Sequence, residues 1–205
     1  MLFIIQKGEK MEKNEDRRIR KSKEALKQSL IELMNKKPVN NIKVKELVCL
    51  ADLNRSTFYN YYSDIPDMLS KLEEEVYNEF LYTIELHIPK KDEVYDIQGE
   101  AHKFIEDICV VIKNNHEFCK CIFSRYGDIS FLLKIEELIE DSARNQLKEI
   151  LDGKVDHLPY AYSFFKSGCI GILKRWIHSD CIEPASEIAK LTYNLGRGII
   201  ETCRI

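Results

Sequence analysis

Glycine is scarce in this sequence of 205 residues: only eight occur, and none lies between residues 9 and 98. Long hydrophobic runs are missing too, since no segment approaches the roughly 18 consecutive apolar residues of a membrane span. The opening MLFIIQKGEK is partly apolar but lacks the basic start and small-residue cleavage site of a secretory signal. These absences argue against a membrane-spanning or exported chain, and we expect a cytoplasmic protein with no membrane partner.

The composition is that of a folded chain, with 44% hydrophobic and 32% charged residues. Seven cysteines without a framework spacing fit reduced thiols better than a disulfide scaffold. Strand-like alternation is rare, whereas apolar residues recur at spacings of three and four. We therefore predict an all-α fold. Beyond residue 97, the expected helices are 98–114, 117–125, 129–151, 159–179 and 184–203.

Charge is distributed unevenly, although the formal net charge is only −3. Residues 1–61 hold 14 Lys or Arg against 8 Asp or Glu, a net of +6, whereas the remainder holds 17 against 26, a net of −9. A basic N-terminal part is suited to binding a polyanion, and the larger acidic part is expected to have a different function. Basic stretches also occur on solvated helix faces, so charge alone leaves both interpretations open.

The first 62 residues read as three helices. A helix follows the basic run RRIRKSK (17–23), and Pro38 ends it by disfavouring helical geometry in the preceding residue. A short helix with an inward Leu47 leads to Asp52, where the chain must turn and where Asp tolerates left-handed geometry. Another short helix starts near Asn54, a good N-cap residue.

Four aromatic residues crowd into the segment LNRSTFYNYY (53–62). Phe58 and Tyr62 are four apart and suit the inner face, which leaves Tyr59 and Tyr61 to face outward. Two short helices joined by a tight turn form a helix-turn-helix, whose second helix enters the major groove of DNA. There, Arg and Asn bond base edges and hydroxyls bond phosphates. The residues expected to contact double-stranded DNA are Lys43, Lys45, Arg55, Ser56, Thr57, Tyr59, Asn60 and Tyr61.

Residues 17–69, above all IKVKELVCLADLNRSTFYNYYSDIPDML, resemble the DNA-binding domain of the tetracycline-repressor (TetR) family of bacterial transcription regulators. The resemblance implies a ligand-released repressor that binds a palindromic operator as a homodimer. Three positions depart from the family pattern. Lys43 replaces a capping Thr or Ser, Asp52 replaces Gly in the turn, and Ile65 replaces a common Lys, so one phosphate contact is expected to be missing.

Three parts of the chain are expected. Residues 1–16 are predicted to be disordered or a misread leader, because a second methionine, Met11, precedes the basic helix and KGEK can be encoded by a ribosome-binding sequence. Residues 17–63 form the helix-turn-helix domain. Residues 64–205 form a helical effector-binding and dimerisation domain, entered by a helix from about 65 to 86 that Asp64 caps.

The segment 159–203 carries apolar stripes on its two expected helices, with small residues among them. Such stripes also serve an intramolecular core. The family resemblance implies that the last two helices of two subunits form a four-helix bundle, and a two-fold dimer matches two successive DNA half-sites. The residues expected at the dimer interface are Gly168, Ile172, Trp176, Ile188, Leu191, Leu195 and Ile199.

By the same resemblance, residues 98–151 would form most of a pocket for an unknown small-molecule effector. The expected lining residues are Phe104, Ile108, Phe118, Phe123, Tyr126, Phe131, Tyr162 and Phe165. Each of them also suits a plain core. The C-terminal region further resembles a subgroup that includes activators of dihydroxyacetone-kinase operons, which work with a protein coregulator. An activator is therefore the alternative to a repressor.

Two other chemistries are open at HEFCKC (116–121). His116, Cys119 and Cys121 are soft metal ligands, but this spacing is incomplete for a zinc site, so packing is the simpler interpretation. Lys120 lies beside both thiols and would lower a thiol pKa, which would suit a redox switch.

A helical enzyme is the alternative from another class, with His102, Glu106 and Asp107 as acid and base groups. No nucleophile elbow, glycine-rich phosphate loop or complete metal set occurs in the sequence. We therefore expect no enzymatic activity, no cofactor and no metal. A DNA-binding protein that organises the nucleoid without a ligand is a third possibility.

Overall fold

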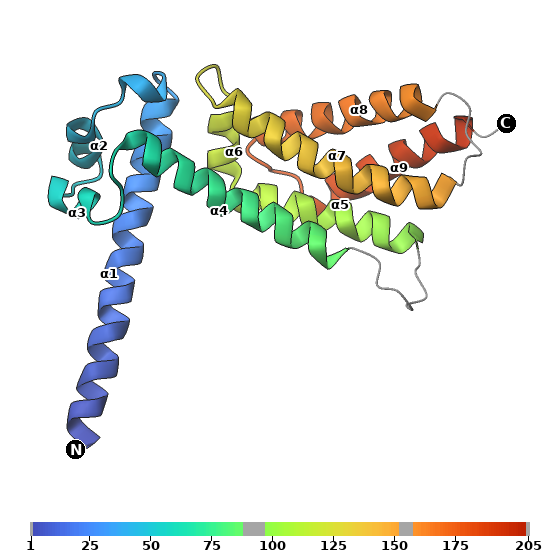
Figure 1. Cartoon of the computed structure of the whole chain (residues 1–205). Helices are drawn as coiled ribbons and strands as arrows, with labels where there is room; N and C mark the ends of the chain where they lie inside the picture. The colour runs from blue at the N-terminus through green and yellow to red at the C-terminus, as the bar shows by residue number, and fades with distance from the viewer. Residues whose placement is uncertain (1, 88–96, 152–157, 204–205) are drawn as a thin grey trace. The chain divides into compact units, whose positions relative to one another are not determined.

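The computed structural model describes residues 2–87, 97–151 and 158–203, which are helical apart from short connections and contain no strand (Figure 1). The all-α prediction is confirmed. The helices are α1 (Leu2–Met34), the 3-10 turn η1 (Val39–Asn41), α2 (Val44–Leu50), α3 (Arg55–Tyr59), α4 (Ile65–Leu86), α5 (Ile97–Asn114), α6 (His116–Ile122), α7 (Ile129–Leu151), α8 (Leu158–His178) and α9 (Ala185–Cys203).

The chain divides into two compact units. The first comprises residues 1–73 and 124–127, and the second comprises residues 74–123 and 128–205. The division falls within α4, so this helix contributes to both units. The functional boundary expected near residue 63 stays a prediction. The prediction that residues 1–16 are a disordered or misread leader also stays a prediction. Helix α1 begins at Leu2, but no side chain before Arg17 is described.

The core of the first unit is built from one apolar face of each of its helices. Leu26 and Leu30 of α1 are fully buried, as are Leu47 of α2 and Phe58 of α3. The ring centroids of Phe58 and Tyr62 lie 5.6 Å apart, and Tyr62 is 5% exposed. The four-residue spacing of this aromatic pair therefore predicted its inward placement correctly. With both rings inside, the other face of α3 is left to solvent.

The connections around α3 are fixed by local backbone bonds. Asp52 has a φ of 53°, as the expected turn requires, and the Leu53 amide donates to the Val48 carbonyl at 2.9 Å. Asn54 occupies the N-cap position, but its side chain makes no capping hydrogen bond, so that part of the expectation was wrong. At the start of α4, Asp64 Oδ1 accepts a hydrogen bond from the Asp67 amide at 2.8 Å. The expected cap of α4 is confirmed.

The second unit is a bundle of helices in which α9 packs against α5 and α8, and α6 packs against α5, α7 and α8. The expected helix ends agree with the observed ones within three residues. The largest difference is the end of α6 at Ile122, where we expected residue 125. Among the described residues, no helix is long and apolar enough to cross a membrane.

The turn between α8 and α9 is held from two sides. Asp180 and Cys181 both have positive φ values, 58° and 49°, and the Cys181 amide donates to the Trp176 carbonyl at 3.0 Å. Left-handed geometry is costly for residues other than glycine, so surrounding contacts must support it. Lys120 of α6 provides one, because its Nζ lies 2.6 Å from Asp180 Oδ1. The turn thereby connects the C-terminal end of α8 to the start of α9.

Candidate DNA-binding surface, cavity and dimer face

The polar residues of α3 lie on the face that the core leaves open. Arg55, Ser56, Tyr59 and Asn60 are exposed, with Tyr59 at 58%. Thr57 and Tyr61, which is just past the end of α3, are half-buried. The expected DNA-contacting side chains of this helix are therefore brought together on one accessible surface, although their contact with DNA stays a prediction.

A polar concavity continues this surface onto α1, and sequence reasoning had assigned no DNA-contacting residue to α1. Arg18 and Ser22 of α1 line it together with Thr57, Asn60 and Tyr61. Lys23 Nζ, also on α1, lies 5.7 Å from the centroid of the Tyr61 ring. The basic run 17–23 was the available sequence signal, because in a helix every third or fourth residue shares a face.

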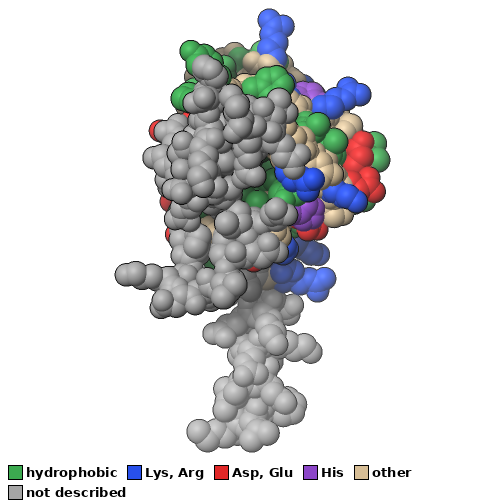
Figure 2. Space-filling model, turned by 90° about the vertical axis from the view of Figure 1, so that its right-hand side faces the viewer, with side chains coloured by type: hydrophobic (Ala, Val, Ile, Leu, Met, Phe, Trp, Pro, Cys, Tyr) green, Lys and Arg blue, Asp and Glu red, His purple; other side chains and the backbone are tan. Residues whose placement is uncertain are grey.

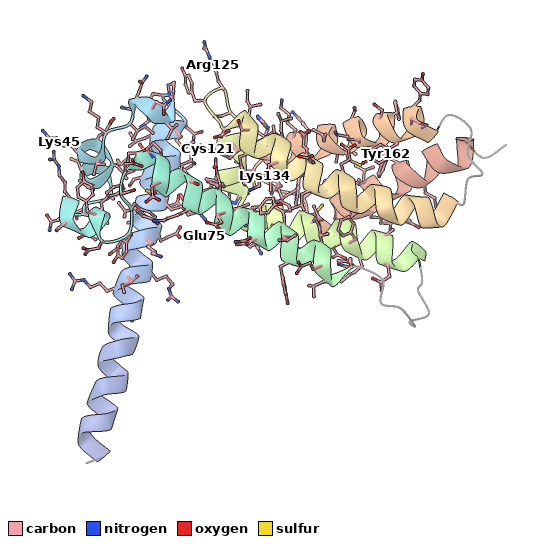
Figure 3. All side chains as sticks on the ribbon, in the orientation of Figure 1. Lys45, Glu75, Cys121, Arg125, Lys134 and Tyr162 are labelled. Carbon is pink, nitrogen blue, oxygen red and sulfur yellow. The ribbon has the colours of Figure 1, made fainter. Side chains whose placement is uncertain are left out.

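The two lysines expected to contact DNA lie at the start of α2 and are exposed. Lys43 occupies the N-cap position without a side-chain cap, as expected from its chemistry, and Lys45 points outward from the helix (Figure 3). A neighbouring cation is already paired, since Lys37 Nζ lies 2.5 Å from Glu46 Oε2. The Lys37 hydrogen bond holds the pKa of Glu46 below its ordinary value. Within the described residues neither Lys43 nor Lys45 forms an ion pair, although the charge of Lys43 also lowers the pKa of Glu46.

The second unit contains a predominantly apolar cavity of about 140 Å³ that is partly open to solvent. Side chains of α4, α5, α6, α7 and α8 line it, together with Phe123 just after α6. Five of the eight expected lining residues take part: Phe118, Phe123, Phe131, Tyr162 and Phe165. Sequence reasoning missed Phe80 of α4, although the regular apolar face of α4 was the available signal.

Three expected lining residues lie elsewhere. Phe104 packs its ring against His87, 5.5 Å between centroids, and Ile108 is buried in the core of the second unit. Ile112, one turn further along α5, lines the cavity instead. Tyr126 belongs to the segment 124–127 of the first unit, where its amide donates to Ser124 Oγ at 3.3 Å. Phe104 and Ile108 lie off the cavity because four-residue steps drift around a helix by about 40° each, whereas Tyr126 lies in the connection between α6 and α7.

Three charged residues stand among the described residues that line the cavity: Glu136 and Glu140 of α7, and Lys166 of α8. Lys166 forms an ion pair with Glu140 across the two helices. Tyr162 reaches from α8 toward α7, where its hydroxyl donates to the Glu140 carbonyl at 3.2 Å (Figure 3). None of the three charges was foreseen from the sequence.

One face of α8 and one of α9 expose apolar and small residues. Phe164 is 69% exposed on α8, and Leu191 and Leu195 are 48% and 52% exposed on α9. A Cβ atom added at Gly168 or Gly171 would meet nothing within 4 Å. On the face in Figure 2, hydrophobic side chains likewise reach the surface beside Lys, Arg and His side chains.

Trp176 corrects the expected dimer interface. It is 1% exposed within the single chain, and its Nε1 donates to the Glu183 carbonyl at 3.1 Å, so it belongs to the core of its own unit. Ile188 is also buried and Ile172 is half-buried, whereas the side chain of Ile199 lies outside the described residues. The accessible members of the expected set are therefore Gly168, Leu191 and Leu195.

The HEFCKC segment forms α6, which buries both of its thiols. Burial raises the pKa of Cys121 to about 11, and Lys120 is turned toward Asp180, so the expected lowering of that thiol pKa is not found. No group of three metal-ligating side chains gathers within the described residues. The side chain of Cys121 lies inside the second unit (Figure 3).

The suggested acid and base groups of α5 have structural neighbours. Asp107 Oδ2 lies 3.0 Å from His87 Nε2, and its Oδ1 lies 2.6 Å from Lys103 Nζ. Burial raises the pKa of Asp107, but the hydrogen bonds from Lys103 and His87 outweigh burial and hold it below its ordinary value. His102 stacks edge-on against Tyr193 of α9. These contacts tie α5 to its neighbours.

Comparison with known proteins agrees with this architecture. Residues 99–198 match the TetR_C_8 family model, described as a transcriptional regulator C-terminal region. This segment is therefore a TetR-type C-terminal region of a transcriptional regulator. No curated protein sequence matches it.

Solved structures of TetR-type regulators share the fold at low identity. The dihydroxyacetone kinase operon activator DhaS is 17% identical, with a TM-score of 0.55 over 90% of this chain and 98% of that one. A TetR regulator from Streptococcus agalactiae is 22% identical, with a TM-score of 0.52 over 89% and 97%. FadR from Bacillus subtilis, solved in complex with stearoyl-CoA, is 15% identical, with a TM-score of 0.53 over 83% and 95%.

Proposed function

We propose that this chain is a homodimeric, sequence-specific DNA-binding regulator of transcription of the TetR family, without enzymatic activity, that binds a palindromic operator. The observation that carries the proposal is the surface of α3, where Arg55, Ser56, Tyr59 and Asn60 stand exposed next to the basic α1. An exposed Arg or Asn at the start of such a helix suits base edges in the major groove.

Dimerisation is proposed through α8 and α9 because their exposed faces combine large apolar with small side chains. Phe164, Leu191 and Leu195 are apolar surface without cover in the single chain, and Gly168 and Gly171 leave room for a close helix. A two-fold dimer would present two copies of α3, which is the arrangement that a palindromic operator requires.

The cavity of the second unit is proposed as the effector site. In this proposal the chain is a repressor, and binding of the effector in the cavity releases it from the operator. Apolar cavities with a few polar groups are the usual form of small-molecule sites. A second candidate is an activator that works with a protein coregulator. The fold similarity to DhaS, an operon activator, is the observation in support of this candidate. A transcription assay with and without the gene for this chain separates the two, because a repressor lowers and an activator raises promoter output.

The DNA-binding surface is tested with three variants titrated against operator and random DNA at several salt concentrations. Arg55→Ala should lose about 1–3 kcal/mol on the operator and relax preference at one base pair per half-site. Tyr61→Phe should weaken both DNAs alike, because a phosphate contact carries no sequence information. Lys43→Ala should lower the salt slope by about one unit if Lys43 meets a phosphate.

The outcomes separate base reading from electrostatic anchoring. If Arg55→Ala weakens operator and random DNA equally, Arg55 is an electrostatic anchor and base reading moves to Ser56 and Asn60. A Glu74→Ala variant is the matched control, because this exposed residue of α4 lies outside the proposed surface. Full operator affinity in all three variants would contradict the proposed surface as a whole.

A further inference from the structure

The described residues that line the cavity carry more carboxylates than cations. Its lining is mostly aromatic and aliphatic, and the described residues contribute two carboxylates, Glu136 and Glu140, but one cation, Lys166. Lys166 forms an ion pair with Glu140. Glu136 lies one turn before Glu140 on the same face of α7 and makes no ion pair among the described residues. Among the described lining residues, Glu136 is therefore the carboxylate with no opposite charge in an ion pair.

Aromatic rings surround this charge. Phe80, Phe118, Phe123, Phe131 and Phe165 line the cavity together with Tyr162. The face of an aromatic ring is electronegative and attracts a cation, more strongly when water is excluded. A half-buried carboxylate beside apolar walls is likewise stabilised by an opposite charge. Rings and carboxylate thus favour a cation, and both disfavour an anion.

We propose that the cavity binds a small organic cation with an apolar body, whose ammonium group pairs with Glu136 and whose body packs against the aromatic rings. The proposal deepens, and rests on, the proposed effector site. The volume of about 140 Å³ limits the size of the ligand. An engineered apolar cavity of about 150 Å³ in another protein binds benzene, so a single ring with a short amine arm is the expected scale.

Three probes of nearly equal size separate charge from shape: benzylamine as the cation, benzyl alcohol as the neutral analogue and benzoate as the anion. Each is titrated into the full-length chain, and binding is followed by NMR chemical shifts and by the thermal unfolding midpoint. We expect benzylamine to bind at least about tenfold more tightly than benzyl alcohol, and benzoate to bind most weakly.

Glu136→Gln keeps the size of the side chain and removes its charge, so it should weaken benzylamine about tenfold and leave benzyl alcohol unchanged. Glu137→Gln is the matched control, because Glu137 is the next residue of α7, is exposed and lies outside the cavity lining. Equal loss in both variants would overturn the proposal, since it would indicate only a change in net charge.

The remaining outcomes distinguish this proposal from the proposed function. Benzoate binding as tightly as benzylamine, or benzylamine binding unchanged by Glu136→Gln, overturns the cation site whatever happens to DNA. Charge-selective binding that depends on Glu136 but leaves operator affinity unchanged supports the cation site and contradicts only ligand-driven release. Operator affinity is therefore measured separately, with and without each probe.

Discussion

Removing the Trp176 side chain tests how the second unit is held together. The indole is 1% exposed, and truncating a buried Trp to Ala costs about 3–5 kcal/mol through lost burial and the cavity left behind. Its Nε1 donates to the Glu183 carbonyl at 3.1 Å, but Lys113 Nζ also donates to that oxygen at 3.3 Å. The carbonyl therefore keeps a partner in Trp176→Ala, and we add no penalty for an orphaned acceptor.

The measurement is urea unfolding followed by far-ultraviolet circular dichroism, because Trp176 is the single tryptophan and its fluorescence disappears with the substitution. Trp176→Phe keeps a ring and loses the hydrogen bond, so about 1–2 kcal/mol is expected for it. The unfolding series is repeated at several protein concentrations, because the stability of a dimer depends on concentration.

Phe164→Ala is the matched control on the same helix. Phe164 is 69% exposed, so its removal should change the stability of the single chain by less than about 0.5 kcal/mol while weakening association. The reasoning is refuted if Trp176→Ala leaves the free energy of unfolding within 1 kcal/mol of the parent and only shifts the chain toward monomers. That result would return Trp176 to the dimer interface.

Three further predictions follow from single positions. Asp52 has a φ of 53°, so Asp52→Gly should preserve or raise stability, whereas the β-branched Asp52→Val should cost about 1–2 kcal/mol in denaturant unfolding. Gly171→Arg should leave the helix content unchanged, since its Cβ meets nothing within 4 Å, but should yield monomers in sedimentation velocity, with Gly171→Ala as control. Because the pKa of Asp107 is lowered in the folded state, its ionised carboxylate stabilises the fold at pH values above the ordinary pKa of Asp. That stability is lost as pH falls through the folded-state pKa, below about 4, and Asp107→Asn should flatten this acid limb of the thermal midpoint. An unchanged acid limb would contradict the Asp107 assignment.

Local patterns in the sequence predicted the elements and their ends. The segment SDIP placed the start of α4 because an Asp cap followed by Pro in the first turn is compatible with few other structures, and Asp64 does cap the helix. The four-residue spacing of Phe58, on α3, and Tyr62, just beyond its end, predicted correctly that both rings face inward. The spacing rule works here because a single four-residue step drifts by only about 40°.

Spacing failed where a helix is long. Four residues advance an α-helix by about 40° beyond a full turn, so Trp176 is rotated by about 80° from Gly168 on α8. That rotation carries Trp176 from the exposed face into the core. The cavity charges could not be predicted either, because Glu140 and Lys166 meet only when α7 and α8 are placed side by side. A single sequence does not show which helix packs against the apolar face of which other helix.

Gly196 of α9 makes one wall of the cavity rigid. A Cβ atom at this position would lie 2.4 Å from Cε2 of Phe165, so the ring is already pressed close to the backbone of α9. Phe165 also lines the cavity, and it has no room to retreat when the cavity fills. Because close-packed interiors resist compression, an oversized ligand must push against the other walls, which include Val76 and Phe80. Both belong to α4, a helix that contributes residues to both units, so expansion of the cavity acts on α4 and the other lining helices and not on α9.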